Sequence, residues 1–480
     1  MPAHRPSPDR PHLEQKKKLA TELLADTRKL NHAQANRFLW NCPRFKGRST
    51  ADVLRMAPKL TDAQHVVARE SGFESWSKMR QYIEFLEDDP GGPAALFEEA
   101  VRAIIGGDVE GLRTLLEKHP ELATMQSQRH HRSYLPHYIA ANGVENEHQI
   151  TPPNAVEVAR VLFAAGADAV IDRPAGFYGG GGSASALVGL VTSGHPHEAG
   201  VQADLVRVFC AAGARVDGID GDGLPLSMAL GFRYPAAAQA LAECGARVDN
   251  LIGAAALGRL ELVHEMLDGR RPSEACELQN PRLCFDRSTA PHPQPLLEQA
   301  FVFAAMCGNL ASLELLFGGG VDIHAGPRQG ITALHEACQR GQLETVQWLL
   351  ERDADPTRRE RQWGATPLGW TNAAQQPEIA EEILRRGRVD ILDAIELERW
   401  DIVRRLLRED PELANGPEGR GAPLRYAAAK GDLALARLLL DAGGDPRLPN
   451  EAGHRAKDYA EKNGHTALVE LLEGTNGTPS

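Results

Sequence analysis

The sequence predicts an all-α protein, a solenoid of about eleven helix-turn-helix repeats preceded by a small helical module. Residues 330–356 have the pattern of one complete pair of short amphipathic helices. Weaker copies of this pair recur along most of the 480-residue chain, at a spacing of about 33 residues. Because such short helices cannot bury their apolar faces alone, each pair must stack on its neighbours.

The best-preserved repeat shows why these residues form two helices. Thr332 stands at the N-cap, where its hydroxyl can accept a hydrogen bond from a free backbone N–H. Leu334 and Ala337 share one stripe of the first helix, and Gly341 ends that helix because glycine enters the left-handed conformation cheaply. The second helix has a single apolar face, made of Leu343, Val346, Leu349 and Leu350.

The other repeats show shorter fragments of the same pattern. First helices open after a glycine at residues 364–368, 421–424 and 453–456. Second helices end in Ala-Gly-Ala or Cys-Gly-Ala at residues 165–167, 212–214 and 244–246. The repeat at 221–250 lacks a clear start for its second helix.

The period and the opening Thr-Ala-Leu-His-Glu-Ala at residues 332–337 resemble the ankyrin repeat, whose opening is Thr-Pro-Leu-His-x-Ala. The resemblance covers residues 94–473 and departs from the family at two positions of the best repeat. Ala333 replaces the usual proline, and Asp353 replaces the usual glycine, so Asp353 is expected to adopt a left-handed backbone. The resemblance implies a concave surface, built from loop tips and first helices, that binds another protein.

Residues 13–87 are expected to form a separate helical module, called the leader. Its segment 60–70 predicts an amphipathic helix capped by Thr61, and Ser75 or Ser77 starts the next helix. The pattern around Gly72-Phe73-Glu74-Ser75-Trp76 resembles a helical leader that precedes bacterial ankyrin arrays, which favours a bacterial source and implies no activity. A core role for the two aromatic residues is favoured over a docking helix pair or a DNA-reading helix-turn-helix.

The remaining segments are a linker, two inserts within the array and the two tails of the chain. Residues 88–93 predict a Pro- and Gly-rich linker between leader and array. Two irregular inserts are expected, at 171–200 and 269–295, and inserts in repeat proteins fall in loops on one face. Residues 1–12 predict a disordered tail and residues 474–480 a frayed one.

Composition narrows the class of protein. The net charge of −12 and the aromatic content of 5% argue against a nucleic-acid partner, which needs clustered basic residues and stacking platforms. Seven cysteines without framework spacing indicate a reducing compartment. The sequence shows no secretory signal and no long apolar run, so we expect a cytoplasmic protein without a membrane partner. The capped ends of the array favour a monomer.

No motif in the sequence carries recognisable chemistry. The tetraglycine run at 179–182 lacks the lysine and hydroxyl of a phosphate loop. Structural hydrogen bonds are favoured over metal binding for His130, His131 and His137, and likewise for His335. We therefore expect no catalytic residue, no metal and no cofactor.

The candidate partner surface lies at the loop tips and adjoining first-helix positions. Trp363 is its most informative residue, since tryptophan and arginine are enriched at binding hot spots. Packing of Trp363 onto the next repeat, or against Trp370, is the alternative. The candidate contact residues are Arg328, Gln329, Ile331, Glu336, Gln339, Arg340, Arg361, Gln362, Trp363 and Arg420.

Three functions remain open at this point. The first is a noncatalytic scaffold that binds another protein through the concave face between residues 300 and 450. The second is an enzyme or effector whose activity lies in the leader or in the two inserts. The third is a regulator that sequesters a toxin-like partner.

Overall fold

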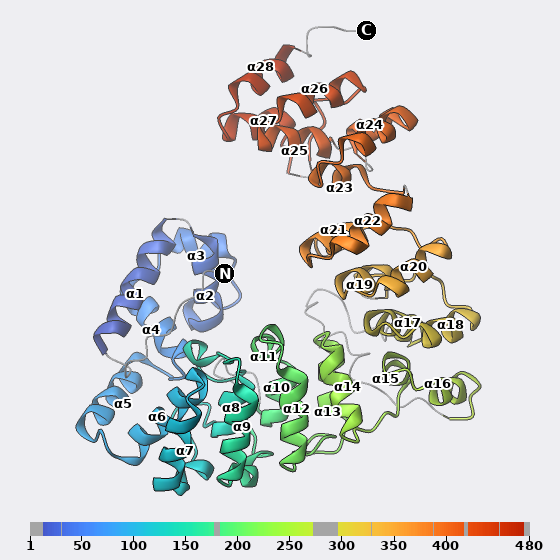
Figure 1. Cartoon of the computed structure of the whole chain (residues 1–480). Helices are drawn as coiled ribbons and strands as arrows, with labels where there is room; N and C mark the ends of the chain where they lie inside the picture. Colours follow the sequence, from blue (N-terminus) through green and yellow to red (C-terminus); the bar gives the residue numbers. More distant parts are fainter. Residues whose placement is uncertain are drawn as a thin grey trace. The chain divides into compact units, whose positions relative to one another are not determined.

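The computed structural model describes residues 13–29, 31–176, 183–271, 296–327, 329–386, 388–416, 421–450 and 452–474. Over these residues the protein is predominantly helical, as predicted, and consecutive helices pair in the manner of a solenoid (Figure 1). None of the helices in the described ranges has the length and apolar character that crossing a bilayer requires. The tails 1–12 and 475–480 lie outside the described residues.

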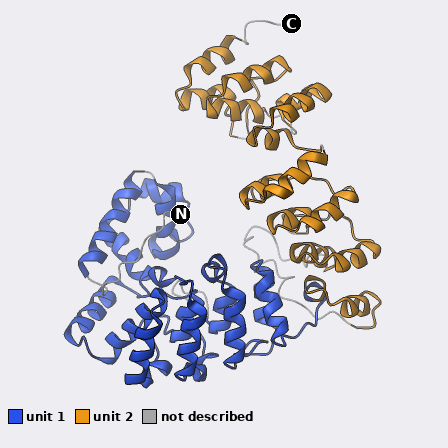
Figure 2. Cartoon of the chain, in the orientation of Figure 1, with its two compact units in different colours: residues 1–253, 274–292 blue, residues 254–273, 293–480 orange. Residues whose placement is uncertain are grey.

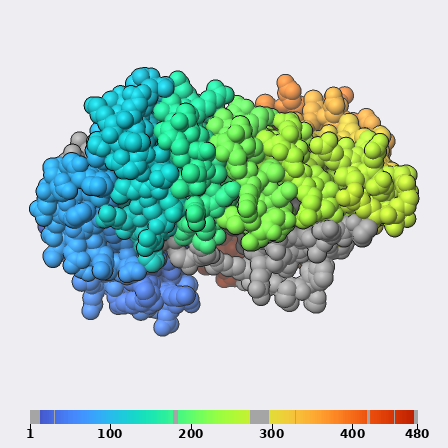
Figure 3. Space-filling view, turned by 90° about the horizontal axis from the view of Figure 1, so that it is seen from below, coloured from blue at the N-terminus to red at the C-terminus, as the bar shows by residue number. Residues whose placement is uncertain are grey.

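The chain divides into two compact units near residue 253 (Figure 2). Unit 1 contains the leader and the first repeats, and unit 2 contains the later repeats. Across the surface of unit 1 the colours follow one another in sequence order, because each repeat packs against its sequence neighbours (Figure 3).

The helices of unit 1 are α1 (Leu13–Arg28), α2 (His32–Asn41), α3 (Thr50–Met56), α4 (Leu60–Glu70), α5 (Trp76–Asp88), α6 (Pro93–Gly106), α7 (Val109–Lys118), α8 (Leu135–Ala140), α9 (Ala155–Ala164), α10 (Ala186–Val191), α11 (Gly194–Glu198), α12 (Gln202–Ala211), α13 (Leu224–Gly231) and α14 (Pro235–Glu243). Its short 3₁₀ helices are η1 (Pro43–Phe45), η2 (Pro120–Thr124), η3 (Asn146–His148) and η4 (Ala167–Val170). A two-stranded antiparallel pair is formed by β1 (Ala175–Gly176) and β2 (Ser183–Ala184).

Helix α15 (Leu251–Ala256) spans the division between the units. The helices of unit 2 are α16 (Leu260–Leu267), α17 (Leu296–Cys307), α18 (Leu310–Gly318), α19 (Ala333–Gln339), α20 (Leu343–Glu351), α21 (Pro367–Ala373), α22 (Pro377–Arg386), α23 (Ile391–Glu396), α24 (Trp400–Glu409), α25 (Ala422–Lys430), α26 (Leu433–Asp441), α27 (Ala456–Lys462) and α28 (Thr466–Gly474), with the 3₁₀ helix η7 (Pro411–Asn415). First helices α17, α19 and α21 pack in succession, and second helices α18, α20 and α22 do the same.

The repeat formed by α19 and α20 follows the local rules of its sequence. The Thr332 hydroxyl accepts from the His335 N–H at 3.4 Å and caps α19. Gly341 has a φ of +73°, and Asp353 has a φ of +62°, so both residues adopt the predicted left-handed backbone. The repeat at 221–250 also forms a second helix, α14, which starts at Pro235 after Arg233 turns the chain with a φ of +65°.

The leader packs on two cores, and the second of them continues into the array. Phe73 is buried there together with Ala94 and Ala95 of α6, and Trp76 packs against both cores. The core role predicted for the two aromatic residues is confirmed. The leader shares this core with α6 across the 88–93 linker, and both lie in unit 1.

Two local predictions for the leader can be compared with the structure. Ser75 caps α5 by accepting from the Lys78 N–H at 3.3 Å, as predicted. The prediction of Thr61 as the cap of α4 is wrong, because the helix begins at Leu60 and Thr61 lies inside it. The Asp62 carboxylate instead accepts from the Lys59 N–H at 2.9 Å.

The expected irregular insert at 171–200 is partly regular. Helices α10 and α11 lie inside it, and the Ser185 hydroxyl caps α10 by accepting from the Val188 N–H at 3.4 Å. All six residues of α10 are buried against α8, α12 and α13, which is why so short an apolar run shows no helical period. Residues 177–182, which hold the tetraglycine run, and most of the 269–295 insert lie outside the described residues.

A buried cluster of charged residues joins the leader to the first repeats. Arg129 is 2% exposed and donates from Nη2 to Glu98 Oε2 of α6 at 2.7 Å. Its Nη1 donates to the Ser71 carbonyl of the leader at 2.9 Å, and its Nε lies 2.6 Å from Glu145 Oε1. One guanidinium therefore connects three segments that are far apart in sequence.

Aromatic and histidine side chains complete this cluster. The Tyr82 hydroxyl donates to Glu98 at 2.8 Å, and the Tyr138 hydroxyl donates to Glu145 at 3.2 Å. Burial would raise the pKa of the Glu145 carboxyl, but Arg129 and His131 beside it hold that pKa well below its ordinary value. The cluster therefore holds the ionised Glu145 carboxylate in the protein interior, compensated by Arg129.

Candidate partner-binding surface

The predicted contact residues occupy three different environments. The side chains of Arg361, Gln362 and Trp363 are exposed, and that of Trp363 is 64% exposed. Gln329, Gln339 and Arg340 are half-buried. Ile331 and Glu336 are only 3% exposed and pack inside the array, so neither can face a partner. Arg328 and Arg420 lie outside the described residues.

The exposed trio belongs to the loop between α20 and α21, and the Glu360 carboxylate holds the tip of that loop. Glu360 is 2% exposed and points inward. Its oxygens accept from three backbone N–H groups, those of Gln362 at 2.5 Å, Trp363 at 2.9 Å and Ala365 at 3.0 Å. A carboxylate that accepts several backbone N–H bonds fixes the local backbone, so Trp363 is displayed on an ordered turn.

Further contacts brace this loop on both sides. Arg359 donates from Nη1 to the Gly364 carbonyl at 2.6 Å, and its Nη2 lies 2.6 Å from Asp390 Oδ1 at the start of α23. On the other side, the Arg361 N–H donates to the Gln329 carbonyl of the preceding loop at 2.6 Å. Neighbouring loop tips are thus joined through their backbones.

The indole of Trp363 is both exposed and partly packed. Its ring lies edge-on to Trp370 of α21, with centroids 6.0 Å apart, and Trp370 lies edge-on to His335 at 5.3 Å. The packing against Trp370 that the sequence offered as an alternative is therefore present, but it leaves most of the surface of the ring in contact with solvent. An aromatic anchor held in this way loses little conformational entropy when a partner covers it.

His335 has the structural role predicted for it. Its Nδ1 accepts from the Thr332 N–H at 3.2 Å, which leaves Nε2 to donate to the Ala365 carbonyl at 3.3 Å. This arrangement requires the neutral imidazole. Burial lowers the pKa of His335 to about 4. His137 repeats the arrangement in unit 1, with the Tyr134 N–H and the Ala184 carbonyl as partners, and burial lowers its pKa to about 4 as well.

Mild acid is expected to destabilise unit 2 through His335. Its folded pKa lies below the ordinary value, so the unfolded chain binds more protons as the pH falls from about 6.5 to 4. The stabilisation is complete above this window and is lost progressively within it, by about 2 kcal/mol between pH 7 and pH 5. Urea unfolding at the two pH values should show a smaller pH dependence in His335→Asn. The exposed His195 provides the matched control, and an unchanged pH dependence in His335→Asn would contradict this assignment.

The histidines grouped by the sequence do not share one site. His130 Nδ1 lies 3.1 Å from Glu74, and His131 Nε2 lies 3.0 Å from Glu145 inside the buried cluster. His137 bonds backbone groups instead. Among the described residues, no group of three or more histidine, cysteine, aspartate or glutamate side chains could hold a metal ion.

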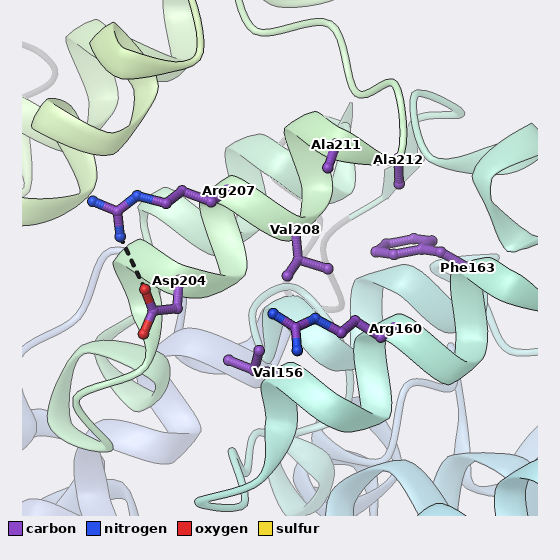
Figure 4. Close-up of a pocket in the computed structure, with 8 residues that line it drawn as sticks. All are labelled: Val156, Arg160, Phe163, Asp204, Arg207, Val208, Ala211 and Ala212. Carbon is purple, nitrogen blue, oxygen red and sulfur yellow. Dashed lines mark hydrogen bonds and ion pairs between the residues drawn. The ribbon is translucent and has the colours of Figure 1, made fainter.

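A hollow of about 650 Å³ lies on the second helices α9 and α12 of unit 1 (Figure 4). Arg160 and Phe163 line one side, and Asp204, Arg207 and Val208 line the other. Its one carboxylate is engaged, because Arg207 Nη1 donates to Asp204 at 2.9 Å. The lining residues therefore offer neither a free general base nor a nucleophile.

Three thiols in the described part of the array are poor nucleophiles. Burial raises the pKa of Cys307 to about 12 and that of Cys210 to about 12, and it raises the pKa of Cys338 further. A thiol with so high a pKa has almost no thiolate at neutral pH. These residues act as small apolar side chains in the packing between helices.

Glu360 is the site residue that the sequence did not single out. Its importance depends on a closed turn whose N–H groups converge on the carboxylate, and no periodic pattern shows that convergence. The available signal was modest. Glu360 is the one acidic residue in the segment Arg358-Arg359-Glu360-Arg361-Gln362-Trp363. A single carboxylate in such a segment can be expected to accept hydrogen bonds from groups of the same loop.

Comparisons with known proteins agree with the repeat pattern. Residues 301–395 match the family model for ankyrin repeats (3 copies). Human mitochondrial disaggregase is 29% identical over 261 residues, which are 48% of this chain and 35% of that protein. The human transient receptor potential cation channel subfamily A member 1 is 27% identical over 191 residues, 38% of this chain and 16% of the channel. This chain thus spans about a third or less of either relative.

Two further matches are shorter or weaker. A probable E3 ubiquitin-protein ligase of Oryza sativa subsp. japonica is 39% identical over 71 residues, 14% of each protein. A chain in the solved structure of a predatory endopeptidase from Bdellovibrio bacteriovorus in complex with an immunity protein matches with a TM-score of 0.27 and 24% identity. That match covers 37% of this chain and 97% of that chain.

Proposed function

Because this chain contains ankyrin repeats, which imply protein binding, we propose that it is a noncatalytic cytoplasmic scaffold whose unit 2 binds a partner protein through its loop tips. The observation that carries the proposal is the turn at residues 360–365. There the protein exposes a tryptophan to solvent and uses a buried carboxylate and an arginine to hold the turn in place. An ordered, exposed aromatic side chain is what a binding hot spot requires.

The contact surface of this proposal is smaller than the predicted set. It consists of Arg361, Gln362 and Trp363, with Gln329 at the adjoining tip. Gln339, the last residue of α19, and Arg340, which caps that helix, belong to the predicted set but are half-buried. Ile331 and Glu336 support the loops from inside, so their replacement would act through folding.

Trp363→Ala is expected to abolish capture of the partner while leaving the fold intact. Truncating a hot-spot tryptophan costs about 2 kcal/mol or more of binding free energy. The full chain and the variant would each be used as bait in lysate of the native host, with quantitative mass spectrometry of what is retained. Trp40→Ala is the matched control, because Trp40 is 78% exposed but belongs to the leader.

The outcomes separate the proposal from its alternatives. A stoichiometric protein that is retained by the wild type and by Trp40→Ala, and lost with Trp363→Ala, supports the scaffold. If all three baits retain the same protein equally, the loop tips of unit 2 are not the binding surface. Turnover of a metabolite by the purified chain, without any partner, would replace the scaffold by an enzyme.

A further inference from the structure

Residues 358–365, called the Trp363 turn below, carry an unbalanced positive charge. Arg358 and Arg361 are exposed, and neither has an ion-pair partner among the described residues. The third arginine of the turn, Arg359, is neutralised by Asp390 at 2.6 Å. The single acidic residue, Glu360, is buried, and its carboxylate oxygens accept hydrogen bonds from backbone N–H groups. The surface of this turn is therefore locally cationic in a chain whose net charge is −12.

Other arginines of unit 2 show that this charge could have been balanced within the protein. Arg388 lies 3.3 Å from Asp355, and Arg399 lies 3.1 Å from Glu381. The segment 358–363 contains no exposed acidic residue that could pair with Arg358 or Arg361. Two guanidiniums and one indole are left facing solvent within six residues.

We propose that this turn binds an acidic, extended peptide segment of the partner, with an apolar side chain on Trp363 and carboxylates on Arg358 and Arg361. The inference rests on the proposed function and narrows its partner class. A planar guanidinium binds a carboxylate through two parallel hydrogen bonds, which gives direction as well as charge. The indole supplies a flat apolar platform in the same exposed segment as the charges, and its turn is already ordered.

The charge distribution favours a peptide over a nucleic acid. Binding to a nucleic acid depends on many phosphate contacts made by a basic stripe, whereas this turn offers two free arginines. The net charge of −12 opposes a long polyanion. A short acidic peptide experiences mainly the local field, because charges more than about 8 Å away are screened at physiological salt.

Selection from a displayed library of random peptides tests this inference with the full chain as target. The wild type should enrich peptides in which aspartate and glutamate flank an apolar residue, and raised salt should weaken their binding. Trp363→Ala should weaken the selected peptides by about thirtyfold or more. The double variant Arg358→Glu/Arg361→Glu should instead enrich basic peptides.

Charge reversal elsewhere provides the control. Arg404 and Arg408 are exposed on α24, so Arg404→Glu/Arg408→Glu changes the net charge equally while leaving the turn intact, and it should still select acidic peptides. Uncharged or basic peptides selected by the wild type would overturn the inference. So would displacement of the selected peptide by single-stranded oligouridylate at equal concentration.

This test is separable from that of the proposed function. If Trp363→Ala loses the native partner but the wild type shows no preference for acidic peptides, the scaffold stands and the acidic-peptide inference fails. If Trp363→Ala keeps the partner, the proposed function fails whatever the library selects.

Discussion

Replacing Arg129 with methionine is expected to lower the free energy of unfolding of unit 1 by about 3–5 kcal/mol, the cost of leaving buried charges uncompensated. Methionine keeps much of the side-chain volume but removes every hydrogen bond of the guanidinium. The Glu98 and Glu145 carboxylates, 3% and 0% exposed, would then lie in the interior without the guanidinium that compensates their charge, although Tyr82 and Tyr138 would still donate to them. Because the Ser71 carbonyl also loses its donor, the leader should loosen from the first repeats.

The measurement is urea unfolding followed by fluorescence, with limited proteolysis of the leader as a second readout. Arg207→Met is the matched control, since Arg207 also pairs with two carboxylates, Asp204 and Glu243, but on the surface. Exposed ion pairs contribute about 1 kcal/mol or less. If the free energy of unfolding falls by the same small amount in both variants, the Arg129 cluster does not hold the leader in place.

A compensated variant separates lost pairing from lost packing. Adding Glu98→Gln and Glu145→Gln to Arg129→Met removes the two carboxylates that the first change leaves without the guanidinium. Since most of the penalty comes from uncompensated charge, the triple variant should recover part of the lost stability. A triple variant less stable than Arg129→Met alone would show that hydrogen-bond geometry, not charge, decides the effect.

Replacing Glu360 with alanine is expected to destabilise unit 2 by about 2–3 kcal/mol and to weaken partner binding as well. Three backbone N–H groups lose their charged acceptor, and hydrogen bonds to charged groups contribute about 1.5–3 kcal/mol each before water replaces part of the loss. The turn should then become mobile in the free protein. Binding a partner would have to order it again, and this loss of conformational entropy, which the native turn does not incur, would weaken the affinity.

Hydrogen exchange at Gln362, Trp363 and Ala365 measures this effect directly. The amides of these residues should exchange faster in Glu360→Ala, together with a lower melting temperature. Glu351→Ala is the control, because Glu351 is exposed on the same repeat and lies 3.6 Å from Arg386. Unchanged protection of the three amides would mean that Glu360 does not hold the turn.

Local signals in the sequence were sufficient for the helices and helix ends of the best-preserved repeat. Thr332 and Gly341 act through their own backbone neighbourhood, so their roles follow from residue type and position. Asp353 was predictable in the same way. Thr61 shows the limit of such rules, because the helix is capped two residues earlier, at Lys59, whose N–H donates to the carboxylate of Asp62 three positions on.

Burial of the candidate site residues depends on packing that the sequence does not display. Ile331 lies at a loop tip and Glu336 lies on the first helix α19, where the sequence predicts contact positions, yet each is only 3% exposed. The Arg129 cluster links residues 31 and 58 positions apart, and no periodicity shows such pairs. Trp363 could be singled out by residue type. However, the turn that exposes it is held by the hydrogen bonds of Glu360, and those bonds exist only once the turn has folded.

The central claim is that the Trp363 turn binds the partner and does not serve mainly to stabilise the fold. Isothermal titration of the captured partner into wild type and Trp363→Ala, with the melting temperature of each, tests it most directly. We predict an affinity loss of about thirtyfold or more with little change in melting temperature. A large fall in melting temperature with unchanged affinity would contradict the claim and assign Trp363 to packing against Trp370.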